Sequence, residues 1–200
     1  MRYSKEHKEQ TREKILDAAG KVFKEQGYAG AGIEAVMREA GLTHGGFYAH
    51  FRNKKALFAE AIRHNARQLR DTRNSSHPEL EGPEWIRAMA HHYLSPGHRD
   101  HVAEGCPMPP LISDLERSET QARETFESVL FTWRDDLLPH LNHLPEEERP
   151  QRALGMLITL VGGMALARAM DSEEQAQELL NAGREQIDHL LATPPSETPQ

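Results

Sequence analysis

The chain has 200 residues, of which 38% are hydrophobic and 28% are charged, a balance typical of a soluble protein with one or two domains. Its single cysteine cannot form a disulfide within the chain, which favours a reducing, cytoplasmic setting over a disulfide-stabilised scaffold. No run of 18 apolar residues is present, and the charged N-terminal stretch lacks the apolar core of a signal peptide. We therefore expect neither a membrane span nor a leader.

Positive charge is concentrated in the first part of the chain, although the formal net charge is −7. Residues 1–71 contain 14 Lys and Arg against 9 Asp and Glu, whereas the remainder contains 10 against 22. No lysine follows Lys55. A local basic region on an acidic body is the pattern of a small head that contacts nucleic acid. From charge alone, random segregation remains an alternative.

Apolar residues repeat at helical spacing along the chain, which predicts an all-α protein of about nine helices. The expected helices of the N-terminal part cover residues 11–26, 33–40, about 44–50 and about 54–70. Gly27 and Gly41 are placed to end the first two helices. Thr43 and Asn53 are placed as N-caps of the third and fourth.

Five further helices are predicted in the rest of the chain, separated by polar loops and prolines. They cover residues 83–93, 111–115, 119–138, 150–170 and 172–191. Residues 71–83 and 95–110 are rich in turn formers and are expected to be irregular. The polar, proline-containing tail from residue 192 to residue 200 is expected to be disordered.

The second and third helices are separated only by Gly41-Leu42-Thr43, which is the arrangement of a helix-turn-helix motif. Leu42, Phe47 and Phe51 are expected to anchor the third helix to its neighbours. Its outward face then carries Thr43, His44, Gly46, Tyr48 and His50, none of which is acidic.

Two adjacent glycines, Gly45 and Gly46, lie inside this third helix, where each costs roughly 1 kcal/mol relative to Ala. Without side chains there, the backbone can approach a groove or a phosphate strand closely. The side chains of Thr43, Tyr48 and His50 can donate hydrogen bonds to phosphate oxygens.

Lys54 and Lys55 lie in the first turn of the fourth helix, where a cation opposes the helix dipole by roughly 0.3–1 kcal/mol. Their position is explained if an anion binds at this helix start, because backbone N–H groups and two ammonium groups then converge on it. The alternative is a solvated basic patch.

Residues 11–62 resemble the DNA-binding head of TetR-family transcriptional regulators. The resemblance rests on Gly27-Tyr28, on AGLTHGGFYAHF at residues 40–51, and on NKKALF at residues 53–58. It implies a homodimeric repressor that binds double-stranded operator DNA with an inverted repeat and leaves it when a small-molecule inducer enters the C-terminal domain. The implied domains are a DNA-binding domain over 1–53, a ligand-binding and dimerisation domain over 54–191, and a tail over 192–200.

The resemblance also implies roles for individual residues of the head. Thr43, Tyr48, His50 and Lys54 would contact phosphates, His44 and Gly46 would face base edges, and Gly45 would permit close approach.

Two features depart from the family pattern. Ala31 and Gly32 stand where the family usually has Thr or Ser, so a phosphate contact is expected to be missing. Gly46 has no side chain to read a base. Specificity would then depend on DNA shape or on N-terminal residues such as Arg2 and Lys5.

The helix over 150–170 is apolar around much of its circumference, so we expect it to be buried on several sides. With the last helix it is predicted to form a two-fold, four-helix dimer interface. The predicted interface residues are Gly162, Gly163, Ala165, Leu179, Leu180, Ile187 and Leu190. The alternative is burial within one chain.

Aromatic and methionine side chains at helical spacing suggest a pocket for an apolar or aromatic ligand, although such residues are more often plain core. The candidate pocket residues are Trp85, Met89, Tyr93, Cys106, Met108, Phe126, Phe131, Trp133 and Met156.

Cys106 and the histidines near it in sequence invite other functions. His91, His92, His98 and His101 follow no standard zinc spacing, and no oxyanion arrangement accompanies a Cys–His pair. We therefore expect no metal, no cofactor and no enzymatic activity.

A thiol sensor remains an alternative, because Cys106 precedes a helix that begins between Pro107 and Pro110, with the later start expected. The competing interpretation of Cys106 is a small buried hydrophobe.

Overall fold

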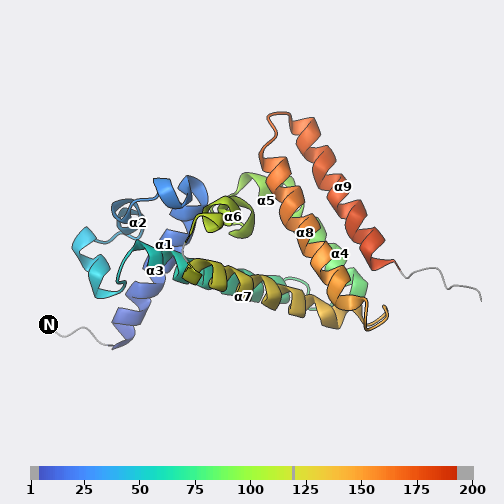
Figure 1. Cartoon of the computed structure of the whole chain (residues 1–200), viewed down its shortest axis with the longest axis horizontal. Helices are drawn as coiled ribbons and strands as arrows, with labels where there is room; N and C mark the ends of the chain where they lie inside the picture. The colour runs from blue at the N-terminus through green and yellow to red at the C-terminus, as the bar shows by residue number, and fades with distance from the viewer. Residues whose placement is uncertain (1–4, 119, 193–200) are drawn as a thin grey trace, which may run out of the picture. The chain divides into compact units, whose positions relative to one another are not determined.

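The computed structural model describes residues 5–118 and 120–192 (Figure 1). Every regular element in those ranges is a helix, which confirms the all-α prediction. The elements are α1 (Lys5–Gly30), α2 (Ile33–Glu39), η1 (His44–Ala49), α3 (Lys54–Ser75), α4 (Gly82–Tyr93), α5 (Pro96–Asp100), α6 (Met108–Glu116), α7 (Thr120–Leu137), η2 (Leu138–Leu141), α8 (Arg149–Arg168) and α9 (Glu173–Leu191), where η marks a 3₁₀ helix. All nine predicted helices are present, and α5 and η2 are additional.

The described residues form two compact units. Unit 1 extends to Thr72 and includes His101–Leu130, whereas unit 2 consists of Arg73–Asp100 and the described residues from Phe131 onward. The chain passes from one unit to the other inside α3 and inside α7. This division differs from the predicted domain boundary after residue 53, because most of α3 and all of α6 group with the N-terminal helices.

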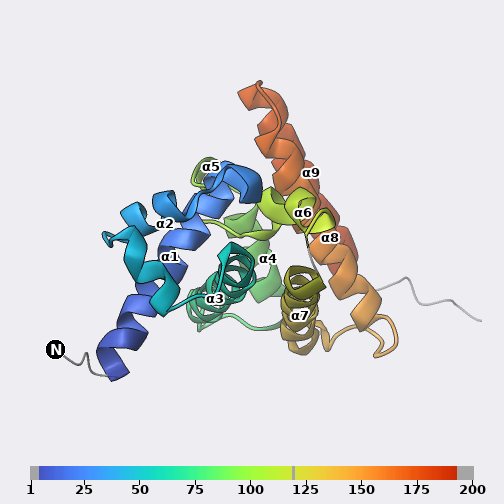
Figure 2. The same cartoon turned by 60° about the vertical axis from the view of Figure 1, so that its left-hand side comes forward.

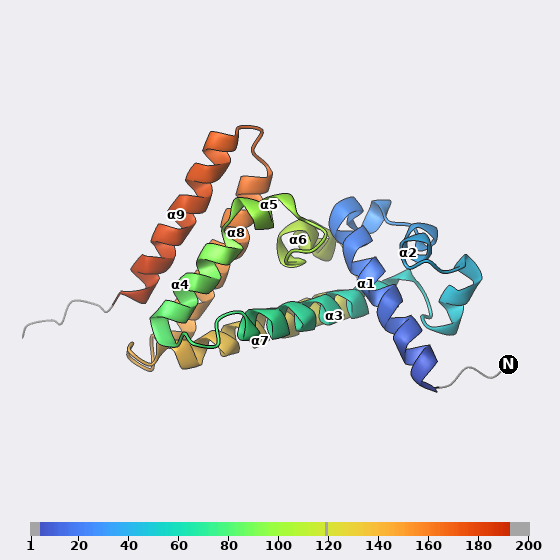
Figure 3. The ribbon, with the colours of Figure 1, turned by 180° about the vertical axis from the view of Figure 1, so that it is seen from behind.

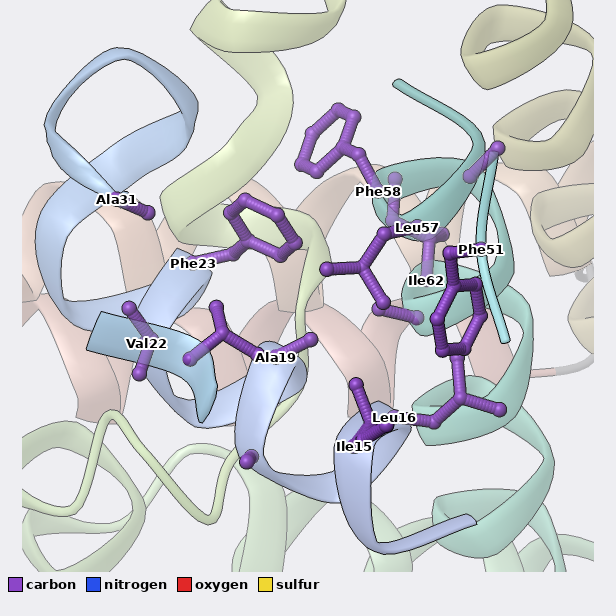
Figure 4. Close-up of a cluster of buried hydrophobic side chains, with 14 of the residues drawn as sticks. Ile15, Leu16, Ala19, Val22, Phe23, Ala31, Phe51, Leu57, Phe58 and Ile62 are labelled. Carbon is purple, nitrogen blue, oxygen red and sulfur yellow. The ribbon is translucent and has the colours of Figure 1, made fainter. Parts of the chain in front are cut away.

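The core of unit 1 is built from the apolar stripes of α1 and α3, as Figure 4 shows. Apolar residues at helical spacing in these helices are buried, whereas Ala56, also expected to face inward, is only partly buried. The buried ones are Ile15, Ala18, Ala19, Val22, Phe23, Leu57, Phe58, Ala61 and Ile62. Phe23 and Phe58 meet edge to face, with ring centroids 5.0 Å apart. These contacts confirm the predicted periodicity of both helices.

Two glycines with positive φ end helical segments, as predicted. Gly27 has φ 69° and interrupts α1, which resumes for one short turn up to Gly30. Gly41 has φ 68°, and its N–H donates to the Arg38 carbonyl while the N–H of Leu42 donates to the Met37 carbonyl. This pair of bonds is a Schellman motif, which stops α2 and turns the chain toward η1.

Helix α6 packs against α1 within unit 1. The buried ammonium of Lys24 donates to the Gly105 carbonyl at 3.0 Å, and the N–H of Tyr28 donates to Asp114 Oδ2 at 2.8 Å. The expected late start of α6 is wrong, because the helix begins at Met108 with Pro107 as its N-cap. Prolines are tolerated in a first helical turn, where their missing N–H would have no intrahelical partner.

Other boundaries differ from the prediction by local extension. Helix α1 begins at Lys5 rather than residue 11, and α3 continues to Ser75 rather than about residue 70. The stretch expected to be irregular contains α5. Glu119, the predicted first residue of the seventh helix, and positions 193–200 of the predicted disordered tail lie outside the described residues, as does Arg2.

Unit 2 is organised around α8 and α9, which lie side by side in Figures 2 and 3, with α4 packed against both. Leu94, at the end of α4, is fully buried between them. A Cβ added at Gly163 of α8 would lie 3.4 Å from a Leu94 methyl carbon, and one added at Gly183 of α9 would lie 2.8 Å from the other. Glycines on both helices therefore make room for Leu94.

By length and composition alone, α8 could cross a membrane, because its most apolar 18-residue stretch has a mean hydropathy of 1.2. Of that stretch, 39% is buried inside the protein. The core helix of a soluble protein meets the same criteria. Residues such as Met156, Leu160 and Met164 are fully buried in unit 2, which accounts for the apolar character of one side of the helix.

The close approach of α1 and α3 generates a stability prediction at Gly20. A Cβ there would lie 2.1 Å from Oδ1 of the buried Asn65 side chain. Gly20→Ala should destabilise the protein, because overpacking of about 1–3 kcal/mol exceeds the roughly 1 kcal/mol gained in helix propensity. The free energy of unfolding in urea measures the effect.

Asn65→Ala tests the cause, since it removes the atoms that the new methyl group would meet. In that background Gly20→Ala should be neutral or stabilising. Gly30→Ala is the matched control, because its Cβ would make an ordinary contact of 3.6 Å with Gln26. An increase in stability from Gly20→Ala alone would contradict the prediction.

Candidate nucleic-acid interface

The six residues of η1 present one buried and one exposed side. Phe47 is fully buried and Phe51, just after the helix, is 3% exposed, with the two rings stacked 5.8 Å apart. Tyr48 is 64% exposed, and its ring lies edge-on to that of His44 at 6.2 Å. Because η1 contains no acidic residue, its exposed side offers hydrogen-bond donors without negative charge.

Thr43 occupies the N-cap position of η1 but does not cap it with its side chain. Its backbone is extended, with φ −79° and ψ 146°, and no side-chain cap bond forms. The predicted side-chain cap is therefore wrong, because η1 is a 3₁₀ helix whose first turn is closed by the bond from the Gly46 N–H to the Thr43 carbonyl. The exposed hydroxyl is then not committed to the helix.

The two glycines of η1 are not required by the protein's own packing. A Cβ on Gly45 would meet no atom within 4 Å, and one on Gly46 would meet Met37 Cε at an ordinary 3.7 Å. Neither residue has a positive φ. Since neither space nor backbone conformation demands glycine, a partner that must approach the backbone closely is the better explanation for the pair.

His50 is half-buried at the end of η1, close to the basic residues of α1. Burial, and then the charges of Lys8 and Arg12, lower its pKa below the usual 6.5. The neutral imidazole is thus favoured near pH 7, and a contact with phosphate would be a hydrogen bond rather than an ion pair.

The start of α3 carries the predicted lysines, but one of its N–H groups is already used. Asn53 Oδ1 accepts from the Ala56 N–H at 2.8 Å, which confirms Asn53 as the N-cap and corrects the expectation that these N–H groups are free for an anion. The ammonium of Lys54 lies 4.4 Å from the centroid of the Tyr28 ring. Burial lowers the pKa of Lys54, while Asp114 acts in the opposite direction. Lys55 is exposed beside it.

The N-terminus of α2 also lacks a capping side chain. Gly32 is the N-cap and forms no side-chain bond, while Ala31 is fully buried. No hydroxyl is available at either position to meet a phosphate.

Comparison with known proteins gives this helix-turn-helix a family. The model for bacterial regulatory proteins of the tetR family matches residues 15–61. YxaF of Bacillus subtilis (strain 168), an uncharacterized HTH-type transcriptional regulator, is 29% identical over 163 residues, or 78% of this chain and 84% of YxaF. AcrR of Shigella flexneri, also an HTH-type regulator, is 37% identical over 59 residues, a match that spans only 27% of AcrR.

Residues 15–61 of the chain thus match the TetR family of bacterial regulatory proteins.

Solved structures share the fold of this chain at low sequence identity. The reduced form of E. coli NemR aligns with a TM-score of 0.78 over 92% of this chain and 98% of that one, at 18% identity. A TetR-family regulator from Cytophaga hutchinsonii aligns with a TM-score of 0.75, covering 94% and 98%.

The predicted pocket residues do not all fall in one unit. Cys106, Met108 and Phe126 belong to unit 1. Trp85, Met89, Tyr93, Trp133 and Met156 are buried in unit 2, where the rings of Tyr93 and Trp133 lie 5.5 Å apart. Phe131 is 42% exposed beneath the Arg134 guanidinium, so its place in a pocket is not supported.

Sequence reasoning missed two groups beside this aromatic cluster. His140 stacks on Trp85 with ring centroids 4.2 Å apart, and burial lowers its pKa. The guanidinium of Arg73 lies 5.2 Å from the Trp133 ring and pairs with Asp136 at 2.7 Å. The stretches that supply these residues were classed as a helix end and a loop, so no apolar periodicity marked them.

The histidines near Cys106 in sequence are not assembled as a metal site. Among the described residues, no three His, Cys, Asp or Glu side chains could together hold a metal ion. His98 has a structural role, since its Nδ1 lies 2.6 Å from the Tyr93 carbonyl oxygen. Cys106 is only 7% exposed, which favours the interpretation of a small buried hydrophobe over an accessible thiol sensor.

Part of the predicted dimer interface belongs to the core of unit 2. Leu180 and Ile187 are at most 1% exposed, so these two residues cannot form an outer surface. Gly163 is partly buried, and a Cβ placed there would face Leu94. Leu190 packs on Gly155 of α8, at 3.3 Å from a Cβ placed there. Gly162 and Ala165 face outward.

The glycine geometry predicts that Gly45→Ala separates folding from DNA binding. The added methyl group meets nothing in the protein, so the melting temperature should stay the same or rise. Affinity for operator DNA should fall by about 1–3 kcal/mol if the backbone must approach a groove. Fluorescence anisotropy with labelled DNA measures it, with Gly30→Ala as the control outside η1. Unchanged affinity would show that the glycines have another cause.

The burial of Cys106 predicts slow chemistry at its thiol. Maleimide should label it only after the protein is unfolded in urea, because the native side chain is 7% exposed. Mass spectrometry of samples quenched over time gives the rate. Rapid labelling of the native protein would instead favour the thiol-sensor alternative.

Proposed function

We propose that this chain is a TetR-family repressor that binds an inverted-repeat operator as a homodimer, in the cytoplasm and in association with the nucleoid. The observation that carries the proposal is the exposed side of η1, which combines Tyr48, His44 and a pair of glycines that the fold itself does not need. Two heads related by a two-fold axis would reach half-sites about 34–36 Å apart.

The dimer is proposed to form through the outer side of α8. Ile158 is 72% exposed, Leu166 is 54% exposed, and Gly162 between them faces open space. The opposite side of the same helix is buried in unit 2. An apolar stripe of this kind on a helix can be covered by the same stripe of a second copy, which gives a closed two-fold interface.

The inducer is proposed to be a small apolar or aromatic molecule that binds in unit 2. Tyr93 and Trp133 provide an aromatic surface there, and the indole N–H of Trp133 is buried with no acceptor among the described residues. A buried donor without a partner costs about 1–3 kcal/mol, so a ligand that carries an acceptor would recover this energy. Its binding would release the repressor from DNA.

The proposed phosphate contacts predict how variants respond to salt. Tyr48→Ala and Lys54→Ala should weaken binding to every DNA sequence, because phosphates carry no sequence information. Loss of the Lys54 charge should also flatten the slope of log K against log salt by about 0.9 for each lost contact, and the proposed dimer loses two such contacts. His44→Ala should instead change which base is preferred. Anisotropy titrations over a salt series measure all three.

Arg67→Gln is the matched control for lost charge, since Arg67 is exposed on α3 about three and a half turns beyond Lys54. It should keep operator affinity. If folded Tyr48→Ala and Lys54→Ala both bind operator as tightly as the parent, the assigned contacts are wrong.

The proposed interface predicts that a charge at Ile158 produces a folded monomer. Ile158→Glu adds a carboxylate to an exposed position, so unit 2 should keep its structure, whereas two such carboxylates would repel across a two-fold axis. Analytical ultracentrifugation measures the mass, and circular dichroism confirms the helix content. Thr132→Glu on exposed α7 surface is the control. A native dimer of Ile158→Glu would place the interface elsewhere.

A further inference from the structure

Unit 1 contains a cavity of about 180 Å³ that is separate from the aromatic cluster of unit 2. Its apolar lining comes from Tyr28 at the end of α1, Phe58 on α3 and Ala122 on α7. Its polar lining comes from Lys55, Arg117, Ser118 and Gln121. The cavity thus lies beside the first turn of α3, next to a residue of the proposed DNA-contacting surface.

The apolar side of the cavity is a fixed aromatic surface. The Tyr28 and Phe58 rings lie 4.8 Å apart, and Phe23 packs edge-on against Phe58 from behind, as Figure 4 shows for the two phenylalanines. Phe58 is 1% exposed, so this surface cannot rearrange without disturbing the core. An apolar cavity of about 150 Å³ accommodates a benzene molecule, so this one has room for a single ring with a small substituent.

The polar side of the cavity is cationic. Lys55 and Arg117 carry positive charge, and the described residues that line the cavity include no carboxylate. The Arg117 side chain has no ion-pair or hydrogen-bond partner among the described residues, so its guanidinium can accept a ligand without losing one. A guanidinium matches the two oxygens of a carboxylate with two parallel hydrogen bonds.

The combination selects one class of ligand. A phosphate dianion would lose hydration against Tyr28 and Phe58, and a neutral ring would leave the Arg117 guanidinium without a counter-charge in the cavity. We propose that this cavity binds a small monocyclic aromatic carboxylate, with the ring on Tyr28 and Phe58 and the carboxylate at Arg117 and Lys55. The amide of Gln121 adds a donor at the same rim.

The site also has a consequence for regulation, and this part rests on the proposed function. Lys55 and Tyr28 both line the cavity. Lys55 and the preceding Lys54 are also the lysines assigned to DNA contacts, and the Lys54 ammonium lies over the Tyr28 ring. A carboxylate bound beside Lys55 adds a negative charge close to these lysines, which lowers the positive potential that attracts an operator phosphate. Bound ligand should therefore lower operator affinity without entering unit 2.

Benzoate is the probe, because its carboxylate is ionised at neutral pH and its ring fits the volume. Isothermal titration calorimetry with the full chain should show saturable binding in the millimolar range or below. Benzyl alcohol and benzylamine keep the ring but remove or invert the charge, and acetate keeps the charge but removes the ring. Each of these should bind more weakly, and equal binding of benzylamine would overturn the proposal.

Variants locate the bound probe. Arg117→Gln should weaken benzoate binding roughly tenfold through loss of the charged hydrogen bonds. Arg123→Gln, an exposed arginine on α7 outside the cavity, should leave it unchanged. Ala122→Leu should fill the cavity and abolish binding. Should Ala122→Leu fail to fold, the arginine pair still decides the question.

The decisive comparison is benzoate binding to the parent, Arg117→Gln and Arg123→Gln, with operator affinity measured in parallel. Selective loss in Arg117→Gln supports the site. No saturable binding by the parent, or equal binding by both arginine variants, overturns it. Calorimetry measures benzoate binding in the absence of DNA, so its result does not depend on the proposed function. If the proposed function is wrong, the ligand-free protein will fail to bind operator DNA in the parallel assay. Unchanged operator affinity at saturating benzoate would overturn the coupling to DNA.

Discussion

Burial of Phe47 and Phe51 holds η1 in place, and the whole surface proposed to face DNA depends on that anchorage. A 3₁₀ helix of six residues has poor hydrogen-bond geometry and would not persist alone. Phe47 is fully buried and Phe51 nearly so, and full burial of such a side chain contributes about 1.5–3 kcal/mol. Arg12 adds a contact on the Phe51 ring at 4.6 Å. Tyr48 follows Phe47 directly, so burial of one ring directs the other outward.

Much of unit 1 was predictable because its determinants are local. The apolar stripe of α1 sets which side is buried, and Gly27 and Gly41 adopt the positive φ that only glycine takes without strain. The outward position of Tyr48 follows from the spacing of Phe47 and Phe51. What spacing could not reveal was the type of η1, since 3₁₀ and α-helices share short apolar patterns. The start of α6 was predicted too late for a related reason. A proline disfavours helical backbone in the residue before it, yet prolines are tolerated in the first turn of a helix.

Long-range contacts explain most of the remaining differences. The sequence pattern indicates that α8 is apolar on two sides, but it does not say which glycine meets which neighbour. Gly163 faces Leu94 and Gly162 faces outward, although the two are adjacent in sequence. One residue is about 100° of rotation on a helix, enough to change an interface position into a core position. For the same reason Leu180 and Ile187 could not be distinguished from interface residues before their packing was known.

Tyr28 connects the proposed operator contacts with the cavity of unit 1. The backbone N–H of Tyr28 donates a hydrogen bond to Asp114 of α6, and the Tyr28 ring packs on Phe58. The ammonium of Lys54 lies over the Tyr28 ring. The ring partly desolvates Lys54, which lowers the pKa of that lysine, whereas the nearby carboxylate of Asp114 favours the charged form. A phosphate of the operator would give the ammonium a counter-charge from outside, and a carboxylate in the cavity would lie at Arg117 and beside Lys55, the residue that follows Lys54. Because both anions act on the same small group of cations, their binding would be coupled by charge, and no large movement of the helices is required for that coupling.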